Sequence, residues 1–319
     1  MEIMKSNEQL NLFGRCQEEE IKKSLFDKFI IPPFSVLDRR QNYWQNRKRA
    51  WLALGIKSEV GRDKHLTYNL NSMSADKDKE VRMGLEEEDA PSTSVFDPVL
   101  CEIAYKWFCP KYGKIIDPFC GGSVRGVVAG FLGYSYVGID LRKEQIEANE
   151  AQAEQILGDS KEHSLEYIQG DSNKVLDNVG GNLFDFAFTC PPYFDLEKYS
   201  DDEKDLSNMD WKGFKEAYSS IIGKTVSKLK NNSFFGIVVG NVRGKDGTFI
   251  GFPKLTQEAM EEAGLKLYDD LIVVNACGSA SMRADKQFNA SRKCVTTHQR
   301  FMVFVRGDPK RATNKIKGE

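Results

Sequence analysis

Several features that define other protein classes are missing from this chain of 319 residues. No apolar run approaches the ~20 residues that a membrane-spanning helix needs. The N-terminal residues are polar and acidic and do not resemble a signal peptide. With 40% hydrophobic residues, the composition still provides enough apolar side chains for a large core. We therefore expect a cytoplasmic protein with one large α/β domain and an extension.

Metal-ligand patterns are also scarce. The chain has three histidines and seven scattered cysteines, and no two cysteines have the CxxC spacing of a zinc site. We therefore expect no metal site, and free thiols in a reducing compartment.

A surplus of positive charge is missing too. Lysine and arginine number 45 against 47 acidic residues, so the formal net charge is −2. This balance argues against strong non-specific binding of nucleic acid, and any such contact must use local patches. The paired glycines at 121–122 also lack the two common phosphate-binding signatures, GxGxxG and the P-loop ending in Gly-Lys-Ser/Thr.

The most informative segment present is FDFAFTCPPY, residues 184–193. Its apolar part predicts a buried strand, which Pro191 and Pro192 end by fixing φ twice and removing two backbone donors. Tyr193 then lies on a rigid turn at the carboxyl end of a strand, where open α/β sheets bind ligands. A ring in that position can stack on a planar substrate such as a nucleobase. An ordinary strand-to-loop stop would give the same pattern.

A second motif lies upstream, in KIIDPFCGGS, residues 114–123. An apolar strand runs into Asp117, and the glycines Gly121 and Gly122 follow before a helix-like apolar run. Glycines at such a turn let the backbone approach a ligand closely. Because both phosphate signatures are absent, a nucleoside-like ligand without a phosphate chain fits this turn better.

Two more predicted strands each end in an acid. Residues 134–140 end in Asp140, which suits hydrogen bonds to ribose hydroxyls. Residues 167–171 end in Asp171, which could accept a hydrogen bond from an adenine amino group. Either acid alone is also typical of a helix N-cap or a solvated loop. Four successive strands that end in the expected residue types favour a ligand site.

In this order the motifs resemble those of S-adenosylmethionine-dependent DNA amino-methyltransferases of the phage and bacterial type. That family modifies the exocyclic nitrogen of adenine or cytosine. The resemblance covers roughly residues 92–306, with the cofactor motif before the catalytic motif. Five segments carry it: SVFDP (94–98), DPFCGG (117–122), GID (138–140), GD (170–171) and CPPY (190–193).

The resemblance implies an α/β fold, the Rossmann-like fold of class I methyltransferases. Its sheet has seven strands, with the last inserted antiparallel between the fifth and sixth. The remaining strands are predicted at 234–241, 267–274 and 300–305, and a helix with a broad apolar face at 211–229. The acidic residues 194–210 are expected to form a loop over the site.

The resemblance also implies S-adenosylmethionine as cofactor and DNA as substrate, with the target base flipped out or unpaired. The implied catalytic residues are Cys190, Pro191, Pro192 and Tyr193. The implied cofactor-binding residues are Phe96, Asp97, Asp117, Pro118, Phe119, Cys120, Gly121, Gly122, Ser123, Asp140, Leu141, Asp171, Ser172 and Thr189.

The implied chemistry is direct methyl transfer in a water-poor pocket. The lone pair of the base amino group is conjugated with its ring, so the nitrogen is a poor nucleophile. Hydrogen bonds to the Pro191 carbonyl region and to residue 190 would favour a tetrahedral nitrogen, and positioning would supply much of the rate. Tyr193 would stack on the target base.

One position departs from the family pattern. The catalytic motif usually begins with Asp, Asn or Ser, whereas Cys190 offers a thiol, a weak acceptor. The choice between adenine and cytosine stays open, with a slight lean to cytosine because Ser is the nearest isostere. Alternatively, Cys190 is a nucleophile for carbon-5 pyrimidine methylation, which requires a lowered thiol pKa. Methyl transfer to RNA or another planar nitrogen substrate, and an inactive nucleic-acid-binding module, also remain open.

Two basic segments are candidates for nucleic-acid contact. In residues 38–51, five cations alternate with three aromatic residues, although Trp44 and Trp51 could instead pack on the main domain. Residues 275–299 predict a long basic loop, and loops of that length are usually functional or disordered. The candidate nucleic-acid-binding residues are Arg39, Arg40, Arg47, Lys48, Arg49, Arg283, Lys286, Arg292 and Lys293.

The predicted organisation has four parts. They are an N-terminal extension (1–66), a charged linker or flap (67–93), the methyltransferase domain (94–307) and a basic tail (308–319). No separate target-recognition domain is evident. Specificity would therefore come from the N-terminal segment, the loops or a second copy of the chain in a homodimer.

Overall fold

The computed structural model describes residues 24–57, 96–158, 164–194, 202–244, 246–275 and 280–318. The predicted linker or flap at 67–93 lies outside these residues. The chain divides into two units, Met1–Pro33 and Phe34–Glu319. In the first, α1 (Leu25–Phe29) starts with a capping box, in which the side chains of Ser24 and Asp27 each accept a hydrogen bond from the other's backbone N–H. Everything that follows lies in the second unit.

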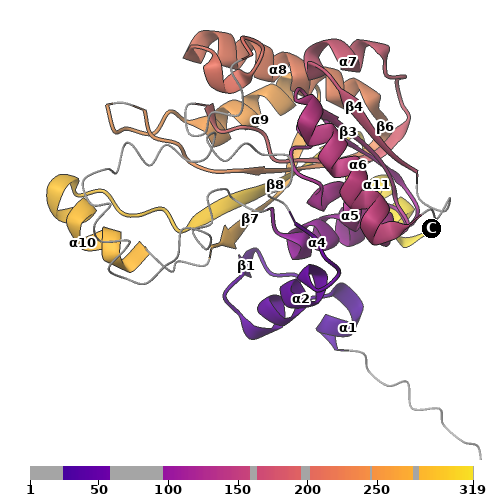
Figure 1. The fold of residues 1–319 in the computed structure, drawn as a ribbon, viewed down its shortest axis with the longest axis horizontal. Coiled ribbons are helices and arrows are strands. Elements are labelled where there is room, and N and C mark those ends of the chain that lie inside the picture. The colour runs from indigo at the N-terminus through magenta and orange to yellow at the C-terminus, as the bar shows by residue number, and fades with distance from the viewer. Residues whose placement is uncertain are drawn as a thin grey trace, which may run out of the picture. The chain divides into compact units, whose positions relative to one another are not determined.

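Eight strands form one sheet in the order β1-β7-β8-β6-β5-β2-β3-β4 (Figure 1). All neighbours are parallel except β8, which is antiparallel to both β6 and β7. The strands are β1 (Val36–Asp38), β2 (Lys114–Asp117), β3 (Ser135–Asp140), β4 (Leu165–Gln169), β5 (Phe184–Thr189), β6 (Leu229–Val239), β7 (Lys266–Val274) and β8 (His298–Arg306).

This strand order confirms the predicted Rossmann-like methyltransferase fold. The last strand lies antiparallel between the two strands that precede it, as expected. The predicted count of seven strands is corrected by β1, which pairs in parallel with β7 through Val36 and Ile272. A strand of three residues is too short to show a period-two pattern, so the sequence did not predict it.

Helices cover both faces of the sheet (Figure 1). Helices α4, α5 and α6 pack together on one face, with α2 and α11 against α4, and α7, α8 and α9 pack on the other. The helices are α2 (Asn42–Leu52), α4 (Pro98–Phe108), α5 (Val124–Phe131), α6 (Lys143–Leu157), α7 (Ser172–Asn178), α8 (Trp211–Lys228), α9 (Phe252–Glu262), α10 (Ala280–Ser291) and α11 (Pro309–Lys317).

The core lies between these layers. Because both faces of the sheet are covered, β5 is buried on both sides, with Phe186, Ala187 and Phe188 all fully buried. On α8 the predicted apolar face is confirmed, since Phe214 and Tyr218 are also fully buried. Among the described helices none is both long and apolar enough to cross a membrane.

The predicted loop at 275–299 is corrected in part. Residues Ala280–Ser291 form α10, which projects beyond the sheet at the left of Figure 1. The segment contains Ala, Met, Arg, Lys and Gln, which are good helix formers, and neither proline nor glycine interrupts it. The polar character of this segment is therefore compatible with a surface helix as well as with a loop.

Candidate functional site

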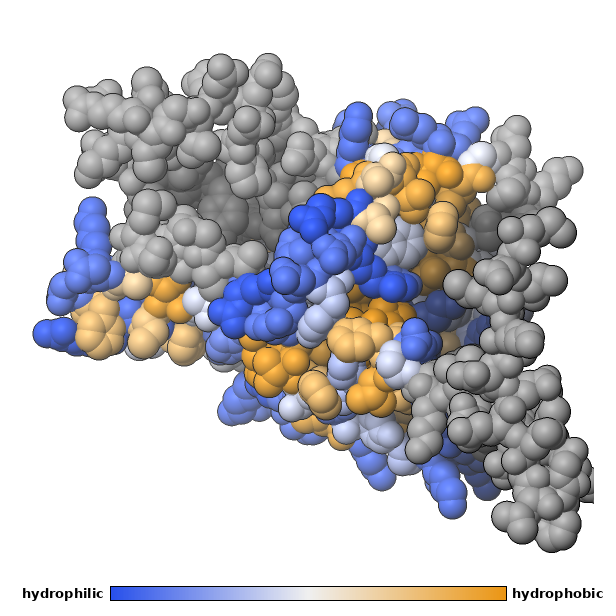
Figure 2. Space-filling model, turned by 90° about the horizontal axis from the view of Figure 1, so that it is seen from below, coloured by the Kyte–Doolittle hydropathy of each residue, from blue (hydrophilic) through white to orange (hydrophobic). Residues whose placement is uncertain are grey.

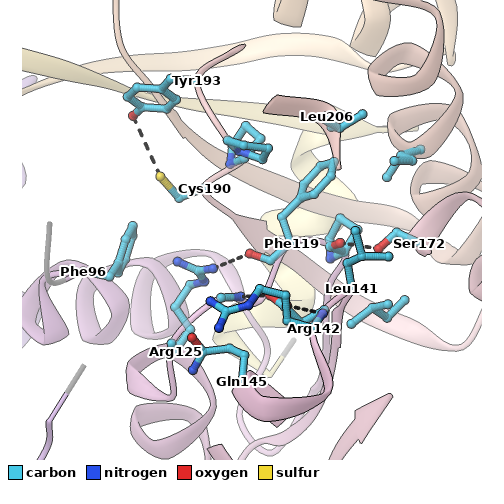
Figure 3. Close-up of a pocket in the computed structure, with 18 of the residues that line it drawn as sticks. Phe96, Phe119, Arg125, Leu141, Arg142, Gln145, Ser172, Cys190, Tyr193 and Leu206 are labelled. Atoms are coloured by element: carbon cyan, nitrogen blue, oxygen red, sulfur yellow. Dashed lines mark hydrogen bonds between the residues drawn. The ribbon is translucent and has the colours of Figure 1, made fainter. Parts of the chain in front are cut away.

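One pocket lies at the carboxyl ends of β2, β3, β4 and β5, where the turns after these strands meet (Figure 3). This is the edge at which open α/β sheets bind ligands. The lining residues are Arg39, Phe96, Asp97, Leu100, Pro118, Phe119, Gly121, Gly122, Val124, Arg125, Ile139, Asp140, Leu141, Arg142, Gln145, Gly170, Asp171, Ser172, Cys190, Pro191, Pro192, Tyr193, Lys204, Asp205, Leu206, Ile221 and Gln299.

The turn after β2 forms the floor of the pocket. Gly121 has a φ of +49°, which explains why a glycine follows the strand here. Its N–H donates to Asp140 Oδ2 at 3.0 Å, and Asp140 Oδ1 accepts from Arg142 N at 2.9 Å. Asp140 therefore joins the glycine turn to the turn after β3 and borders the pocket.

The turn after β4 supplies Asp171 and Ser172. Asp171 Oδ1 accepts from Asn173 N at 2.9 Å, so this residue is the N-cap of α7 as well as a lining residue. Ser172 Oγ donates to the Pro118 carbonyl at 2.5 Å and connects this turn to the one after β2. The N-cap interpretation and the site interpretation of Asp171 are thus both compatible with its position.

Four of the predicted cofactor residues lie behind the lining. Asp117, Cys120, Ser123 and Thr189 are buried and do not border the pocket. Asp117 accepts from Arg125 Nε at 2.5 Å, from Thr189 Oγ1 at 2.6 Å and from the Tyr136 hydroxyl at 2.8 Å. These residues hold the lining in place rather than presenting groups to a ligand.

Arg125 was missed by the sequence analysis. Its Nη2 donates to the carbonyls of Phe119 and Cys120, at 2.6 and 2.8 Å, and its guanidinium lies over the Phe96 ring at 4.6 Å. Burial alone would lower the pKa of Arg125, but Asp117 beside it holds that pKa well above its ordinary value. A lone arginine among the valines of α5 was the signal that could have revealed it.

The CPPY turn forms the opposite wall. The Tyr193 hydroxyl accepts from Gln299 Nε2 at 2.9 Å, and the ring meets Phe252 edge-on at a centroid distance of 5.7 Å. A Cβ at Gly240 would lie 3.2 Å from the ring, so the side chain rests against bare backbone. Cys190 Sγ is 3.8 Å from the same hydroxyl (Figure 3). The side chain of Tyr193 is thereby fixed from three directions.

Three residues from the described part of the predicted loop at 194–210 line the pocket. A short 3-10 helix, η3 (Leu206–Asn208), begins at the N-cap Asp205. Leu206 is buried and lines the pocket together with Asp205 and Lys204. Gln299, on β8, was also missed because it lies at the start of a strand, with no nearby motif to mark it.

The residues of segment 38–51 have different roles. Trp44 and Trp51 are buried, as the packing alternative predicted. Arg39 borders the pocket, and Arg47 donates to the buried Glu102 through Nε at 2.6 Å and through Nη2.

The other cations of this segment lie toward solvent. Arg40 pairs with the neighbouring Asp38, and Lys48 is half-buried on α2. Arg49 is exposed on the same helix, where its Nη2 donates to Asn46 Oδ1 at 2.5 Å. None of these three side chains borders the pocket.

The described candidate cations of the second basic segment do not border the pocket. Lys286 is on α10, and Arg292 and Lys293 follow it, with the Arg292 guanidinium 5.3 Å from the centre of the Phe288 ring. Arg283 is within α10, but its side chain lies outside the described residues. Figure 2 shows hydrophilic and apolar residues side by side on this projection, at the left of the view.

Metal binding has no visible basis in the described part of the chain, where no group of His, Cys, Asp and Glu side chains could hold an ion. Five described cysteines are thiols outside any disulfide: Cys101, Cys109, Cys120, Cys190 and Cys294. Burial raises the pKa of the first three well above the ordinary value. Cys190 is only partly buried and is the one of the five that borders the pocket.

No protein-family model and no curated protein sequence matches this chain. Among solved structures, a SAM-dependent methyltransferase from Methanosarcina mazei is 13% identical (TM-score 0.43; 67% of this chain and 99% of that one). Magnesium protoporphyrin IX methyltransferase from Synechocystis with bound SAM is 11% identical (TM-score 0.41; 66% and 76%). A candidate DNA modification methylase from Thermus thermophilus is 14% identical (TM-score 0.33; 43% and 51%). These likenesses are too distant to assign a substrate.

Proposed function

We propose that this protein is an S-adenosylmethionine-dependent methyltransferase that modifies the exocyclic amino nitrogen of cytosine or adenine in DNA. One observation carries the proposal. A single pocket brings the glycine turn, Asp140 and Asp171 together with the CPPY turn. A site for a nucleoside-containing donor and a site for a planar acceptor are therefore neighbours in one cavity.

The lining suits S-adenosylmethionine. Asp140 and Asp171 provide carboxylates where ribose and adenine would need acceptors, and Phe119 and Leu141 provide apolar surface in the same pocket. Gly121 and Gly122 let the backbone come close without a side chain in the way. When bound, the cofactor supplies an electrophilic methyl group on a sulfonium sulfur.

The CPPY turn would position the acceptor. Tyr193 would stack on the target base, and the Pro191 carbonyl and Cys190 would accept hydrogen bonds from its amino group. With the amino nitrogen held by these residues, the bound cofactor would supply the methyl group and leave as a neutral thioether, and the amino group would lose one proton. Leu206 and the prolines keep water from the reacting atoms, and the fixed geometry of Tyr193 limits the entropy lost on binding.

The local cations support a nucleic acid as the substrate. Lys48 and Arg49 on α2, and Lys286, Arg292 and Lys293 in the second basic segment, can contact phosphates. These contacts would also suit RNA, which remains the alternative nucleic-acid substrate. The target base must leave its stack in either case, because the acceptor nitrogen of a paired base cannot reach the pocket.

A second candidate is carbon-5 methylation of a pyrimidine with Cys190 as nucleophile. The observation that favours it is that Arg125 and the partly buried Cys190 line the same pocket. A neighbouring cation is what a reactive thiolate requires. Against it, the guanidinium of Arg125 is already paired with Asp117.

The test is nucleoside mass spectrometry of DNA and RNA from cells that express the wild type, Tyr193→Ala or Tyr112→Ala. Tyr112 is an exposed control at the amino end of β2. We expect N4-methylcytosine or N6-methyladenine in DNA with the wild type and the control, and its loss with Tyr193→Ala. A new 5-methylcytosine would favour the second candidate. A new methylated nucleoside found only in RNA would identify RNA as the substrate instead of DNA. If no new nucleoside is found, the proposal is overturned.

A further inference from the structure

We propose that Arg39 binds the carboxylate of the amino-acid end of the cofactor, while Asp97 beside it faces the ammonium group. The proposal rests on the proposed function, and it adds a residue from outside the segment that resembles the amino-methyltransferases. Arg39 lies in the turn between β1 and α2 and borders the same pocket as the CPPY turn.

The backbone of Arg39 is fixed by the sheet. Its N–H donates to the Val274 carbonyl at 3.2 Å, directly after the last register pair of β1 with β7, Asp38 with Val274. The side chain therefore starts from a defined point at the carboxyl end of β7. This is the same edge of the sheet at which the other lining turns lie.

The side chain forms an ion pair inside the pocket wall. Arg39 Nε donates to Asp97 Oδ2 at 2.9 Å, and Nη1 donates to Asn275 Oδ1 at 3.0 Å. The Asp97 side chain is 2% exposed and the Arg39 side chain 18%, so the carboxylate is buried and the guanidinium reaches the cavity. The buried carboxylate of Asp97 is thus paired with a guanidinium that is partly exposed to the cavity.

Both partners keep binding capacity. A guanidinium has five N–H donors, and the described residues provide acceptors for two of those of Arg39. Asp97 accepts from Arg39, from Trp44 Nε1 at 3.1 Å and from Val99 N at 3.0 Å. A carboxylate has about four lone-pair sites, so one remains.

The other cations of the lining suit the carboxylate less well. Arg125 is almost fully buried and is committed to Asp117 and to two carbonyls. Arg142 lies in the lower centre of Figure 3, farther from Phe96 than Arg125, and Lys204 precedes Leu206, which is on the side of the pocket away from Phe96. Arg39 pairs with Asp97, the residue after Phe96. It is therefore the cation left to bind a carboxylate on the Phe96 side of the pocket.

Charge complementarity supports the same arrangement. An α-amino acid is a zwitterion, and the pair of Arg39 and Asp97 presents one charge of each sign to it. Planar guanidinium groups bind carboxylates in two parallel hydrogen bonds, and partial exclusion of water strengthens such contacts. The net charge of the wall stays at zero before and after binding, so the pair avoids burying an uncompensated charge.

The experiment compares three probe ligands by isothermal titration calorimetry. S-adenosylhomocysteine has both charged groups, its decarboxylated analogue keeps only the amine, and 5′-methylthioadenosine has neither. The proteins are the wild type, Arg39→Gln, Arg39→Lys and the control Arg40→Gln, whose side chain is 56% exposed and paired with Asp38.

We expect Arg39→Gln to weaken S-adenosylhomocysteine binding on the order of 10- to 100-fold, because a charged hydrogen bond is lost. Binding of the other two ligands should stay within about twofold, and Arg39→Lys should fall between. Equal losses for all three ligands would make Arg39 only a support of the wall and would overturn the proposal, as would no loss. If the wild type binds none of the ligands, the proposed function itself fails. If Arg39→Gln does not fold, Arg39→Lys against the decarboxylated analogue makes the same comparison.

Discussion

At the scale of single residues, the hydroxyl of Tyr193 and the thiol of Cys190 share one small region, 3.8 Å apart. Gln299 donates to that hydroxyl, so its oxygen already acts as an acceptor on one side. A sulfur atom is a poor acceptor, and it is also larger than the oxygen found at this position in the amino-methyltransferases that the sequence resembles. Under the proposed function, the atom at position 190 would therefore decide how well the amino group of the base is held.

The first prediction concerns Cys190→Ser. If methyl transfer is direct, the serine oxygen should hold the amino group better and raise kcat by about 2- to 10-fold, the value of one hydrogen bond. The measurement is transfer of a labelled methyl group to DNA, with Cys294→Ser, at an exposed position, as the control. Complete loss of activity in Cys190→Ser alone would instead identify a nucleophilic cysteine.

At the scale of elements, α2 is bound to α4 through one buried acid. Glu102 accepts from Arg47 and, at 2.9 Å, from Trp51 Nε1, and its side chain is 6% exposed. Hydrogen bonding to Glu102 raises the pKa of Arg47 above its ordinary value. The arginine thus stabilises the helix that carries the turn of Arg39 next to the pocket.

The second prediction follows for the cations of α2. Arg47→Ala should lower the free energy of unfolding by about 1–3 kcal/mol, because Glu102 stays buried and loses both hydrogen bonds from Arg47. This expected loss is smaller than for a fully buried ion pair, because the Arg47 side chain is 41% exposed and water partly screens its charge. Arg49→Ala, on the exposed face, should change it by less than about 0.5 kcal/mol. Urea unfolding of both variants is the measurement, and equal effects would contradict the assigned roles.

Much of the fold could be read from the sequence at this scale. The strands 114–117, 135–140 and 184–189 are recognisable because apolar runs end at or just before Asp or Pro, whereas their arrangement in the sheet was expected from the resemblance to the amino-methyltransferases. The site was only partly predictable. Residues such as Arg39, Arg125 and Gln299 enter the pocket through ion pairs and strand register, which are long-range contacts that no local pattern encodes.

At the scale of the whole molecule, the core is rich in buried ionisable groups that are kept neutral. Burial raises the pKa of Cys101, Cys109 and Cys120, and of the buried tyrosines Tyr105 and Tyr136. In the unfolded chain these groups ionise at their ordinary values, near 9.0 for the thiols and 10.0 for the phenols. The folded state therefore binds more protons at alkaline pH.

The third prediction is a loss of stability in alkali. A group whose pKa is higher in the folded protein than in the unfolded chain stabilises the folded state. This contribution is fully present at a pH below the unfolded-state pKa, and it is lost as the pH rises toward the folded-state pKa. The free energy of unfolding should thus fall above about pH 9, by up to about 1.4 kcal/mol per pH unit for each buried thiol. Urea unfolding in reductant at pH 7.5, 9 and 10 measures the slope. Cys101→Ala should make the slope shallower, while Cys294→Ala should not, and a flat profile in the wild type would contradict the prediction.

The pairing of β1 with β7 also limits how early during synthesis of the chain the pocket can be complete. Val36 emerges from the ribosome early, whereas its partner Ile272 is made roughly 240 residues later. At about 5–20 residues per second, translation separates the two by roughly 10–50 s. Over that interval Arg39 has neither Asn275 nor the β7 backbone to hold it. A nascent chain can thus form the central strands and the glycine turn while the wall around Arg39 is still missing, so the finished pocket is a late product of synthesis.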